Sequence, residues 1–252
     1  MIIQKYKKDK ANRYKVVIDD EEYTLYDDII IQYGLLMKKE LTKKELEEIM
    51  LANDELESYY RSIKYITKKM RSIREMEEVL EKWCYGDTTI KKTIKRLQDN
   101  HFLNDENYLK AFINDKINLT NHGPKKIRSE LLKLGIKEEL IDEALEKVSN
   151  HLWQDKAERY IQKKIETNHR SSARMLKIKI SNDLVNLGYE KEDFISILNK
   201  YDIIDEEIAE KEYLKIRKQL EKKYSGSVLE NKIKERMYRK GFHYSKEWSY
   251  EE

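Results

Sequence analysis

The sequence is poor in the residues that make tight turns and cross-links. Its 252 residues include seven glycines, one proline and one cysteine, Cys84. So few glycines and prolines argue against an all-β protein and against a glycine-rich phosphate loop. A single cysteine excludes an intramolecular disulfide and a site built from several thiolates, and it agrees with a reducing compartment. We therefore predict a mainly helical protein.

Long apolar runs are also missing. Hydrophobic residues make up 39% of the chain and charged residues another 39%. No run approaches the roughly 18 apolar residues that span a membrane. Residues 1–8 lack the apolar stretch of a signal peptide. We predict a cytoplasmic protein with no membrane partner, whose thin core is spread over an elongated shape.

The motifs of common catalytic sites are absent as well. The chain has no G-x-S-x-G, no P-loop, no dinucleotide-binding fingerprint and no H-E-x-x-H. Cys84 is interpreted as a small buried filler rather than a nucleophile. The five histidines lack the spacing of metal ligands; they are His101, His122, His151, His169 and His243. We predict a non-enzymatic protein without cofactor or metal, and an enzyme with an unfamiliar site stays as an alternative.

The N-terminal segment has a different pattern from the rest. Residues 13–18 and 23–26 are rich in β-branched and aromatic side chains, and they flank an acidic turn. This pattern predicts either a β-hairpin or a three-stranded flap in which residues 2–6 add a strand. Asp27 is placed to cap a helix after this flap, and residues 42–45 (TKKE) form a capping box for the next helix.

Internal repetition is the most informative feature. When Cys84, Gly135, Gly188 and Gly241 are superposed, at spacings of 51, 53 and 53 residues, three apolar columns align. They stand eight and four residues before and one residue after each anchor: Met76, Ile127, Ile180 and Ile233; Leu80, Leu131, Leu184 and Met237; Tyr85, Ile136, Tyr189 and Phe242. The first two columns share a helix face, and glycine suits the left-handed residue that ends a helix. Each repeat is therefore predicted to contain a helix, a glycine stop and another helix.

A further helix precedes the anchor helix, which gives about three helices per repeat. Glu247 and Glu251 stand where repeat 4 needs apolar residues for its third helix, so this repeat is predicted to be truncated. Such units bury little apolar surface alone, and we predict that they stack into an elongated, curved solenoid. The predicted domains are a β-hairpin with two short helices at 1–53, repeat 1 at 54–104, repeat 2 at 105–152, repeat 3 at 153–205 and repeat 4 at 206–252.

Charge is segregated along the chain, although 51 basic residues nearly balance 48 acidic ones. Residues 108–137 carry a net +5 and residues 156–181 a net +6, whereas 138–150 carry −4 and 182–210 carry −7. Two stripes of opposite sign suit the anionic and cationic surfaces of one assembly. Charge runs in a chain rich in Lys and Glu also arise as solvated helix faces with internal ion pairs, and this alternative stays open.

Basic residues near helix starts are the candidate binding residues. Lys125, Lys126 and Arg128 follow a Gly-Pro pair, where side chains and free backbone N–H groups together favour phosphate or carboxylate. Tyrosines interleave with basic residues at 59–65, a pattern that suits base stacking but is more typical of packing between helices. The residues predicted to bind a partner or DNA are Lys64, Lys68, Arg71, Arg74, Lys125, Lys126, Arg128, Lys177, Lys179, Lys232 and Lys234.

Several short motifs resemble one known family. Residues 102–113 (FLNDENYLKAFI) are followed by 123–131 (GPKKIRSEL) and 133–136 (KLGI), and residues 71–76 (RSIREM) are similar to an R-S-x-x-E-L signature. In this order they resemble the RecX family, the regulators of the bacterial recombinase RecA. The resemblance runs from about residue 55 to the end. The N-terminal flap resembles the extension of longer members from low-GC Gram-positive bacteria.

The chain departs from the family pattern at three places. Asn104 stands where an acidic residue is usual, and Cys84 replaces a glycine. Residues 118–122 (NLTNH) lack the arginines common before the Gly-Pro pair. These departures weaken the case for phosphate contacts in that loop.

The resemblance implies a regulator that makes and breaks no bond. Such a protein enters the groove of the RecA filament on single-stranded DNA and inhibits filament growth, ATP hydrolysis and strand exchange, so modulating recombination and the SOS response. We predict a monomer whose partners are the RecA filament and single-stranded DNA, contacted directly or through RecA. A helical-repeat nucleic-acid-binding protein that acts independently of RecA stays as an alternative, and tight, salt-dependent binding to bare DNA would distinguish it.

Overall fold

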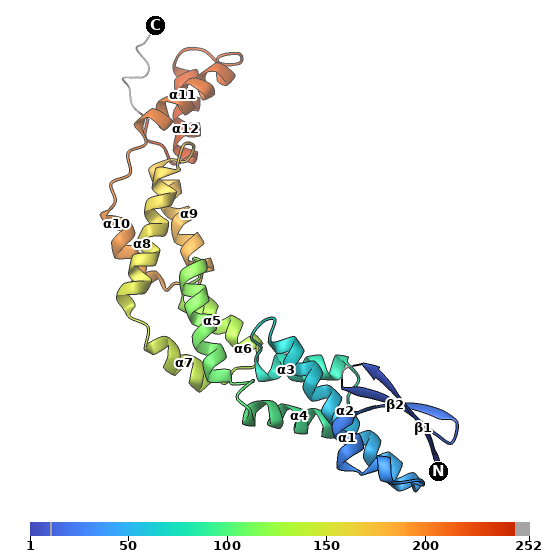
Figure 1. The fold of residues 1–252 in the computed structure, drawn as a ribbon. Coiled ribbons are helices and arrows are strands. Elements are labelled where there is room, and N and C mark those ends of the chain that lie inside the picture. The colour runs from blue at the N-terminus through green and yellow to red at the C-terminus, as the bar shows by residue number, and fades with distance from the viewer. Residues whose placement is uncertain (11, 245–252) are drawn as a thin grey trace. The chain divides into compact units, whose positions relative to one another are not determined.

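The computed structural model describes residues 1–10 and 12–244. It confirms the predicted class, mainly helical with a small N-terminal sheet (Figure 1). In chain order the elements are β1 (Ile3–Lys10), β2 (Arg13–Ile18), β3 (Glu21–Tyr26), α1 (Asp27–Gln32), the 3-10 helix η1 (Leu35–Met37), α2 (Lys43–Ile66), α3 (Ile73–Lys82), α4 (Asp87–Asp99), α5 (Asp105–Leu119), α6 (Pro124–Lys133), α7 (Glu138–Glu146), α8 (Asn150–Glu166), α9 (Ala173–Asn186), α10 (Lys191–Lys200), α11 (Glu206–Leu220) and α12 (Gly226–Arg239).

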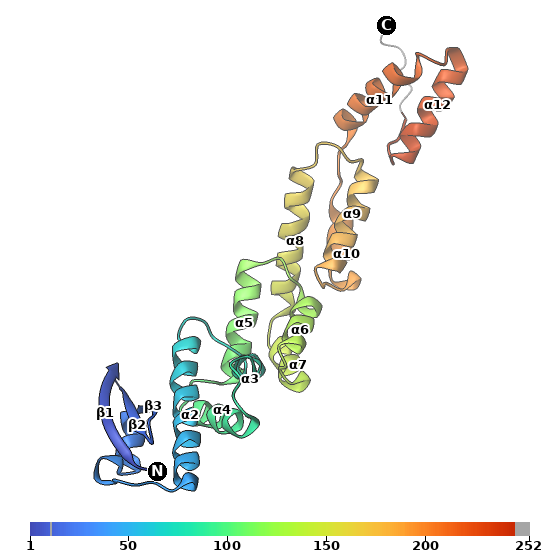
Figure 2. The ribbon, with the colours of Figure 1, turned by 90° about the vertical axis from the view of Figure 1, so that its right-hand side faces the viewer.

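The N-terminal sheet is antiparallel with the strand order β1-β2-β3, and it lies beside α2 (Figure 2). Asp19 and Asp20 between β2 and β3 have φ of 46° and 67°, which is the left-handed geometry of a tight hairpin turn. Val16 and Leu25 are fully buried and belong to one apolar cluster with Ile49 of α2. The three-stranded form of the prediction is therefore correct, and a hairpin alone is too small.

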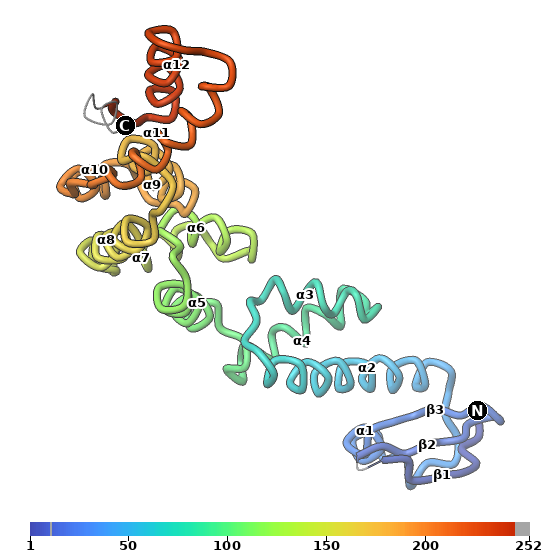
Figure 3. Tube along the Cα trace, turned by 90° about the horizontal axis from the view of Figure 1, so that it is seen from above, coloured from blue at the N-terminus to red at the C-terminus, as the bar shows by residue number. Residues whose placement is uncertain are grey.

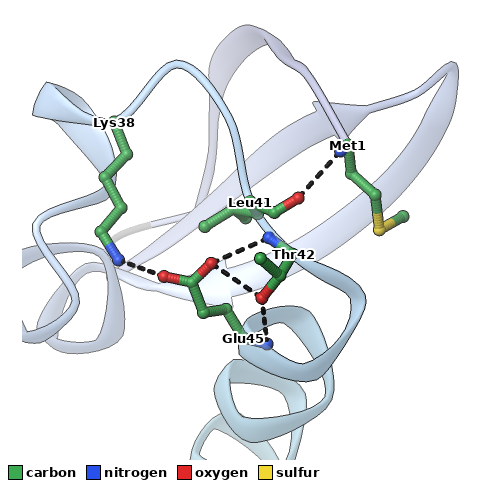
Figure 4. A network of polar contacts seen from close by, with 5 residues as sticks. All are labelled: Met1, Lys38, Leu41, Thr42 and Glu45. Atoms are coloured by element: carbon green, nitrogen blue, oxygen red, sulfur yellow. Dashed lines mark hydrogen bonds and ion pairs between the residues drawn. The ribbon is translucent and has the colours of Figure 1, made fainter.

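The turn before α2 is held by the predicted capping box (Figure 4). Glu45 N donates to Thr42 Oγ1 at 3.2 Å, and Thr42 N donates to Glu45 Oε2 at 2.8 Å. Lys38 Nζ donates to Glu45 Oε1 at 2.9 Å, and the ammonium of Met1 donates to the Leu41 carbonyl at 2.8 Å. The Thr42 N–H, Lys38 and the Thr42 hydroxyl together lower the pKa of the Glu45 carboxyl to about 2.

Replacing this carboxylate with an amide is expected to remove a pH-dependent part of the stability. The pKa of Glu45 is about 2 in the folded chain against 4.5 ordinarily, so its ionised form stabilises the fold above pH 4.5 and this stabilisation is lost as pH falls towards 2. Glutamine keeps a capping-box acceptor but does not titrate. The urea midpoint of the wild type should exceed that of Glu45→Gln at neutral pH, and the gap should narrow as the solution is acidified. A gap that does not change with pH would contradict this.

Helix α2 runs without a break through the boundary predicted after Asn53. The side chain of Asn53 is buried: Tyr26 N donates to its Oδ1 at 3.0 Å, and its Nδ2 donates to Thr24 O at 3.2 Å. The amide is thus satisfied by the backbone around β3, so the sheet and repeat 1 share one helix.

The helix after the sheet begins one residue earlier than predicted. Asp27 is the first residue of α1, whose N-cap is Tyr26, so the capping role predicted for Asp27 is wrong.

From α2 onward the described helices form three groups of three and a final pair. The end of α2 groups with α3 and α4, which lie beside it in Figure 3; α5 to α7, α8 to α10, and α11 with α12 follow. The second helix of a group has 10 residues in α3 and α6 but 14 in α9 and α12. Glu247 and Glu251, on which the predicted truncation of repeat 4 depends, lie outside the described residues.

The predicted stops between helices are confirmed. Cys84, Gly135, Gly188 and Gly241 have φ of 64°, 78°, 90° and 80°, the left-handed conformation that ends a helix. After each anchor the next N–H donates to the carbonyl four residues before the anchor: Tyr85 to Leu80, Ile136 to Leu131, Tyr189 to Leu184 and Phe242 to Met237. The two apolar columns before the anchors are buried. The repeat alignment therefore found the buried face of every anchor helix.

Three anchors also pack closely against the preceding repeat. A Cβ added at any of them would clash with the start of that repeat's second helix. The nearest atoms would be Arg74 Cδ at 2.3 Å from Gly135, Lys126 N at 2.4 Å from Gly188 and Ser172 Oγ at 2.6 Å from Gly241. Cys84 belongs to the first repeat and its side chain is exposed. The prediction that Cys84 is a buried filler is therefore wrong, and its exposure explains why this anchor accepts a side chain.

Hydrogen bonds join the start of the second helix in one repeat to the end of the second helix in the next repeat. Ser72 Oγ donates to Leu134 O, and Ser172 Oγ donates to Lys240 O, both at 2.9 Å. Between repeats 2 and 3 the backbone makes the equivalent contact: Gly123 N to Leu187 O at 2.7 Å and Lys125 N to Gly188 O at 3.1 Å. Both N-cap serines also accept a hydrogen bond from their own helix.

Ser172→Ala is expected to lower the free energy of unfolding by about 1–2 kcal/mol, since it removes an N-cap and leaves the Lys240 carbonyl without its partner. Ser149→Ala is the matched control, because Ser149 caps α8 through His151 N at 3.3 Å and has no hydrogen bond to the next repeat among the described residues. Urea unfolding of both variants measures the difference. Equal losses would show that the bond between repeats contributes nothing.

The chain divides into two compact units. Unit 1 comprises Met1–Ala111 and Leu131–Leu140, and unit 2 comprises Phe112–Glu130 and Ile141–Glu252. Unit 1 holds apolar clusters around the sheet and within repeat 1, and unit 2 holds one within repeat 4. Among the residues that the structure describes, no helix is both long and apolar enough to cross a membrane. The curvature of the stacked repeats stays a prediction.

Candidate partner-binding surface

In repeat 1 the predicted basic residues surround the turn between α2 and α3. Lys64 lies on the last turn of α2, Lys68 lies in the turn itself, and Arg71 and Arg74 flank the start of α3. Lys64 and Lys68 are exposed and form no ion pair with any described residue. Their charges are therefore available to an anionic partner.

A stack of arginines and aromatic rings supports this turn. The Arg71 guanidinium lies 4.8 Å from the ring centroid of Tyr65 and 3.2 Å from Glu75 Oε1. Arg61 lies 4.0 Å from the ring of Trp83, and the rings of Tyr65 and Trp83 meet edge to face at 5.6 Å. Cation–π contacts of this kind hold a guanidinium in place. The stack thus fixes the segment that carries Lys68.

The tyrosines of α2 pack between elements, as the packing interpretation expects. Tyr59 is buried, with Arg96 at 4.0 Å from its ring centroid. Tyr60 is more exposed, and its hydroxyl donates to Asp28 Oδ2 at 3.0 Å. Tyr59 therefore has no free ring face for a nucleobase.

The start of α6 differs from the sequence prediction. The N–H groups of Gly123 and Lys125, expected to be free for an anion, donate to the carbonyls of Leu187 and Gly188. Lys126 is half-buried, and its backbone packs against Gly188. This helix N-terminus is therefore occupied by the next repeat, and the predicted phosphate cradle of backbone donors is wrong.

Two cations of α6 have acidic partners, one on a third helix and one immediately before a third helix. Arg128 forms two hydrogen bonds to Asp142 of α7, Nε to Oδ1 at 2.7 Å and Nη2 to Oδ2 at 3.2 Å. These bonds lower the pKa of the Asp142 carboxyl. Lys125 Nζ lies 3.1 Å from Oε1 of Glu190, which immediately precedes α10. The basic and acidic stripes therefore touch, and part of the segregated charge is neutralised within the chain.

The predicted cations of repeats 3 and 4 fall into two groups. Lys177 lines a groove of about 320 Å³ between α9 and α10, together with Ile178 and Ile195. Lys179 is exposed on α9, and neither lysine forms an ion pair with a described residue. The predicted cations of repeat 4 have internal partners: Lys232 with Glu235 at 3.2 Å and Lys234 with the Tyr244 ring at 4.8 Å. Arg74 of repeat 1 likewise pairs with Glu78 at 3.2 Å.

The histidines are spread over different elements. His122 Nδ1 lies 3.1 Å from Glu130 Oε1, and His151 Nδ1 lies 3.0 Å from Asp155 Oδ2. Burial lowers the pKa of His122, against the opposite effect of the Glu130 charge. Over residues 1–10 and 12–244, no three His, Cys, Asp or Glu side chains are grouped so that they could hold a metal ion.

Sequence reasoning missed a group of cations on α8. Lys156, Arg159 and Lys163 are spaced at i, i+3 and i+7, which places them on one face of the helix. Lys156 and Arg159 also line a cavity of about 490 Å³ between the end of α5 and the start of α8. The net +6 of residues 156–181 pointed to this region, and the helical spacing was the signal that could have selected these three residues.

Known proteins match nearly the whole chain. Regulatory protein RecX of Bacillus cytotoxicus is 30% identical over 246 residues, which cover 95% of this chain and 91% of that protein. Regulatory protein RecX of Listeria welshimeri is 28% identical over 244 residues, covering 94% and 90%. A family model described as RecX, second three-helix domain, matches residues 104–145. The chain belongs to the RecX family.

Two solved structures have the same fold as this RecX-family chain. A crystal structure of regulatory protein RecX aligns with a TM-score of 0.67 at 21% identity, covering 79% of this chain and 99% of that one. The crystal structure of RecX from Lactobacillus salivarius aligns with a TM-score of 0.56 at 25% identity, covering 61% and 99%. The match to regulatory protein RecX along 95% of the chain confirms the resemblance that the motifs indicate.

Proposed function

We propose that this chain binds the RecA filament on single-stranded DNA and inhibits its growth, ATP hydrolysis and strand exchange. It acts as a monomer in the cytoplasm, without catalysis, and so modulates recombination and the SOS response. The observation that carries the proposal is the match to regulatory protein RecX along 95% of the chain. Exposed lysines and carboxylates of the repeats that form no ion pair with a described residue support it.

Four of the predicted cations that form no ion pair with a described residue are the proposed contacts. Lys64 and Lys68 in repeat 1, and Lys177 and Lys179 in repeat 3, form no ion pair with a described residue. Binding them to phosphates, or to acidic groups of the recombinase, breaks no bond inside the chain, whereas using Arg128 would break its bidentate contact with Asp142. Among the paired cations, Lys125 joins repeat 2 to repeat 3 through Glu190, whereas Arg74 and Lys232 pair within their own helices.

The third helices supply charge of the opposite sign. Glu139 of α7 and Glu192 of α10 are exposed and form no ion pair with a described residue. Carboxylates on one set of helices and lysines on another suit a partner that presents both DNA phosphates and basic protein surface. An assembly of recombinase on DNA is such a partner.

The test is a titration of RecA with the purified protein. Single-strand-dependent ATP hydrolysis and strand exchange are expected to fall as the protein is added and to be inhibited at stoichiometric excess. Rates that stay unchanged at that excess would overturn the proposal. Unchanged rates together with tight, salt-dependent binding to bare DNA would favour the helical-repeat protein that acts independently of RecA.

A further inference from the structure

The cavity beside α8 is lined by cationic and polar side chains that the proposed partner contacts do not include. Its walls carry Asn118, Ser149, His151, Asp155, Lys156 and Arg159, together with two aliphatic side chains. Its volume of about 490 Å³ falls in the range of small-ligand pockets, roughly 300–1,000 Å³. It therefore has room for a phosphate group with an attached sugar.

Lys156 brings a partly desolvated charge to this cavity. Its ammonium group donates to the carbonyls of Ile117 and Thr120 at the end of α5, the latter at 2.8 Å. An ammonium group has three donors, so one remains. Burial lowers the pKa of Lys156, and the charge of Arg159 lowers it further. An anion in the cavity would offset both effects.

The other two cations of this face form no ion pair among the described residues. Arg159 and Lys163 are exposed, and their side chains form neither an ion pair nor a hydrogen bond with any residue that the structure describes. Asp155 also lines the cavity and is the one carboxylate among its described lining residues; its Oδ2 lies 3.0 Å from His151 Nδ1. Arg159 and Lys163 form a cationic stripe with Lys156, and this stripe leads from the cavity along α8.

We propose that the cavity binds a phosphate group and that the stripe binds the neighbouring phosphates of a single-stranded nucleic acid. The planar fork of an arginine recognises phosphate oxygens in pairs, and lysines add point charges. Ile117 and Leu152 give the cavity an apolar wall for a sugar or base. The phosphate site is independent of the proposed function, whereas the choice of a DNA strand over a free phosphate rests on it.

The first arm of the test measures DNA binding without RecA. The anisotropy of a labelled oligothymidylate is recorded over a series of salt concentrations for the wild type, for Arg159→Glu/Lys163→Glu and for Lys222→Glu/Lys223→Glu. The control pair is exposed, has no ion pair among the described residues and changes the net charge equally. The α8 variant should bind at least about tenfold more weakly, with a log–log salt slope smaller by about 1.4, and the control should retain wild-type binding. Equal behaviour of the two variants, or no binding by the wild type, would overturn the nucleic-acid assignment.

The second arm uses inorganic phosphate. The imidazole resonance of His151, assigned with His151→Gln, is followed as phosphate replaces chloride at constant ionic strength. A saturable shift in the wild type that is absent from Arg159→Glu/Lys163→Glu supports the phosphate site. A shift in this arm with no effect in the first assigns the site to a free or small phosphorylated ligand. No response in either arm overturns the inference.

The RecA titration keeps this inference separate from the proposed function. If the wild type inhibits RecA but the α8 variant binds DNA as the wild type does, only the DNA assignment fails. If the α8 variant loses DNA binding but the wild type leaves RecA unaffected, only the proposed function fails.

Discussion

Gly188→Ala is expected to destabilise unit 2 by about 3 kcal/mol and to lower its unfolding midpoint by about 10 °C. Gly188 has a φ of 90°, where a residue with a Cβ is strained by about 1–2 kcal/mol. The added Cβ would also lie 2.4 Å from the backbone nitrogen of Lys126. Because that nitrogen belongs to a helix, it cannot rotate away as the end of a flexible side chain would.

Gly226→Ala separates the clash from the strain. Gly226 also lies in unit 2 and has a φ of 55°, but a Cβ there meets nothing within 4 Å. Its replacement should therefore cost only the conformational strain, about 1 kcal/mol. Thermal unfolding of the two variants gives the comparison. Equal midpoints would mean that the contact between Gly188 and the start of α6 does not stabilise the repeats.

Reversing the charge of Lys64 and Lys68 is expected to raise the protein concentration needed for half-maximal inhibition of RecA ATPase by at least about tenfold. Both lysines are exposed and lack ion pairs within the described residues, so each reversal removes an attraction and adds a repulsion to an anionic partner. The supporting stack of Arg61, Trp83 and Tyr65 is untouched. The fold should therefore stay intact, which circular dichroism checks.

Lys43→Glu/Lys44→Glu is the matched control for this variant. It makes the same charge change at the N-terminus of α2, where acidic side chains stabilise a helix. Inhibition by this control should equal that of the wild type. If both variants inhibit equally well, the turn between α2 and α3 is not a contact, and if both fail equally, net charge alone sets the affinity.

The features that the sequence predicts well are those set by local geometry. A residue in the left-handed conformation ends a helix through local geometry, so the stops at Gly135, Gly188 and Gly241 could be predicted from the repeat spacing alone. The capping box at Thr42 and Glu45 has an equally local cause. The greater length of α9 was not predicted, because an alignment on the anchors shows where a helix ends but not where it begins. Ser172, the N-cap of α9, was the local signal for its start.

The features that the sequence does not predict depend on packing between helices. Lys125 and Glu190 are 65 positions apart in the chain, and nothing local indicates that they lie 3.1 Å apart. For the same reason the sequence analysis expects the N–H groups at the start of α6 to be free, although the next repeat accepts hydrogen bonds from them. The cavity beside α8 arises where two helix ends meet, so the sequence does not indicate that Asn118 and Arg159 both line it.

The central claim is that the repeats of this RecX-family chain recognise the RecA filament rather than its DNA alone. The most direct measurement compares the affinity of the labelled protein for preassembled RecA–single-stranded DNA filaments with its affinity for the same DNA without RecA, at one salt concentration. We expect tight binding to filaments and much weaker binding to bare DNA. Equal affinities, or tighter binding to bare DNA, would contradict the account.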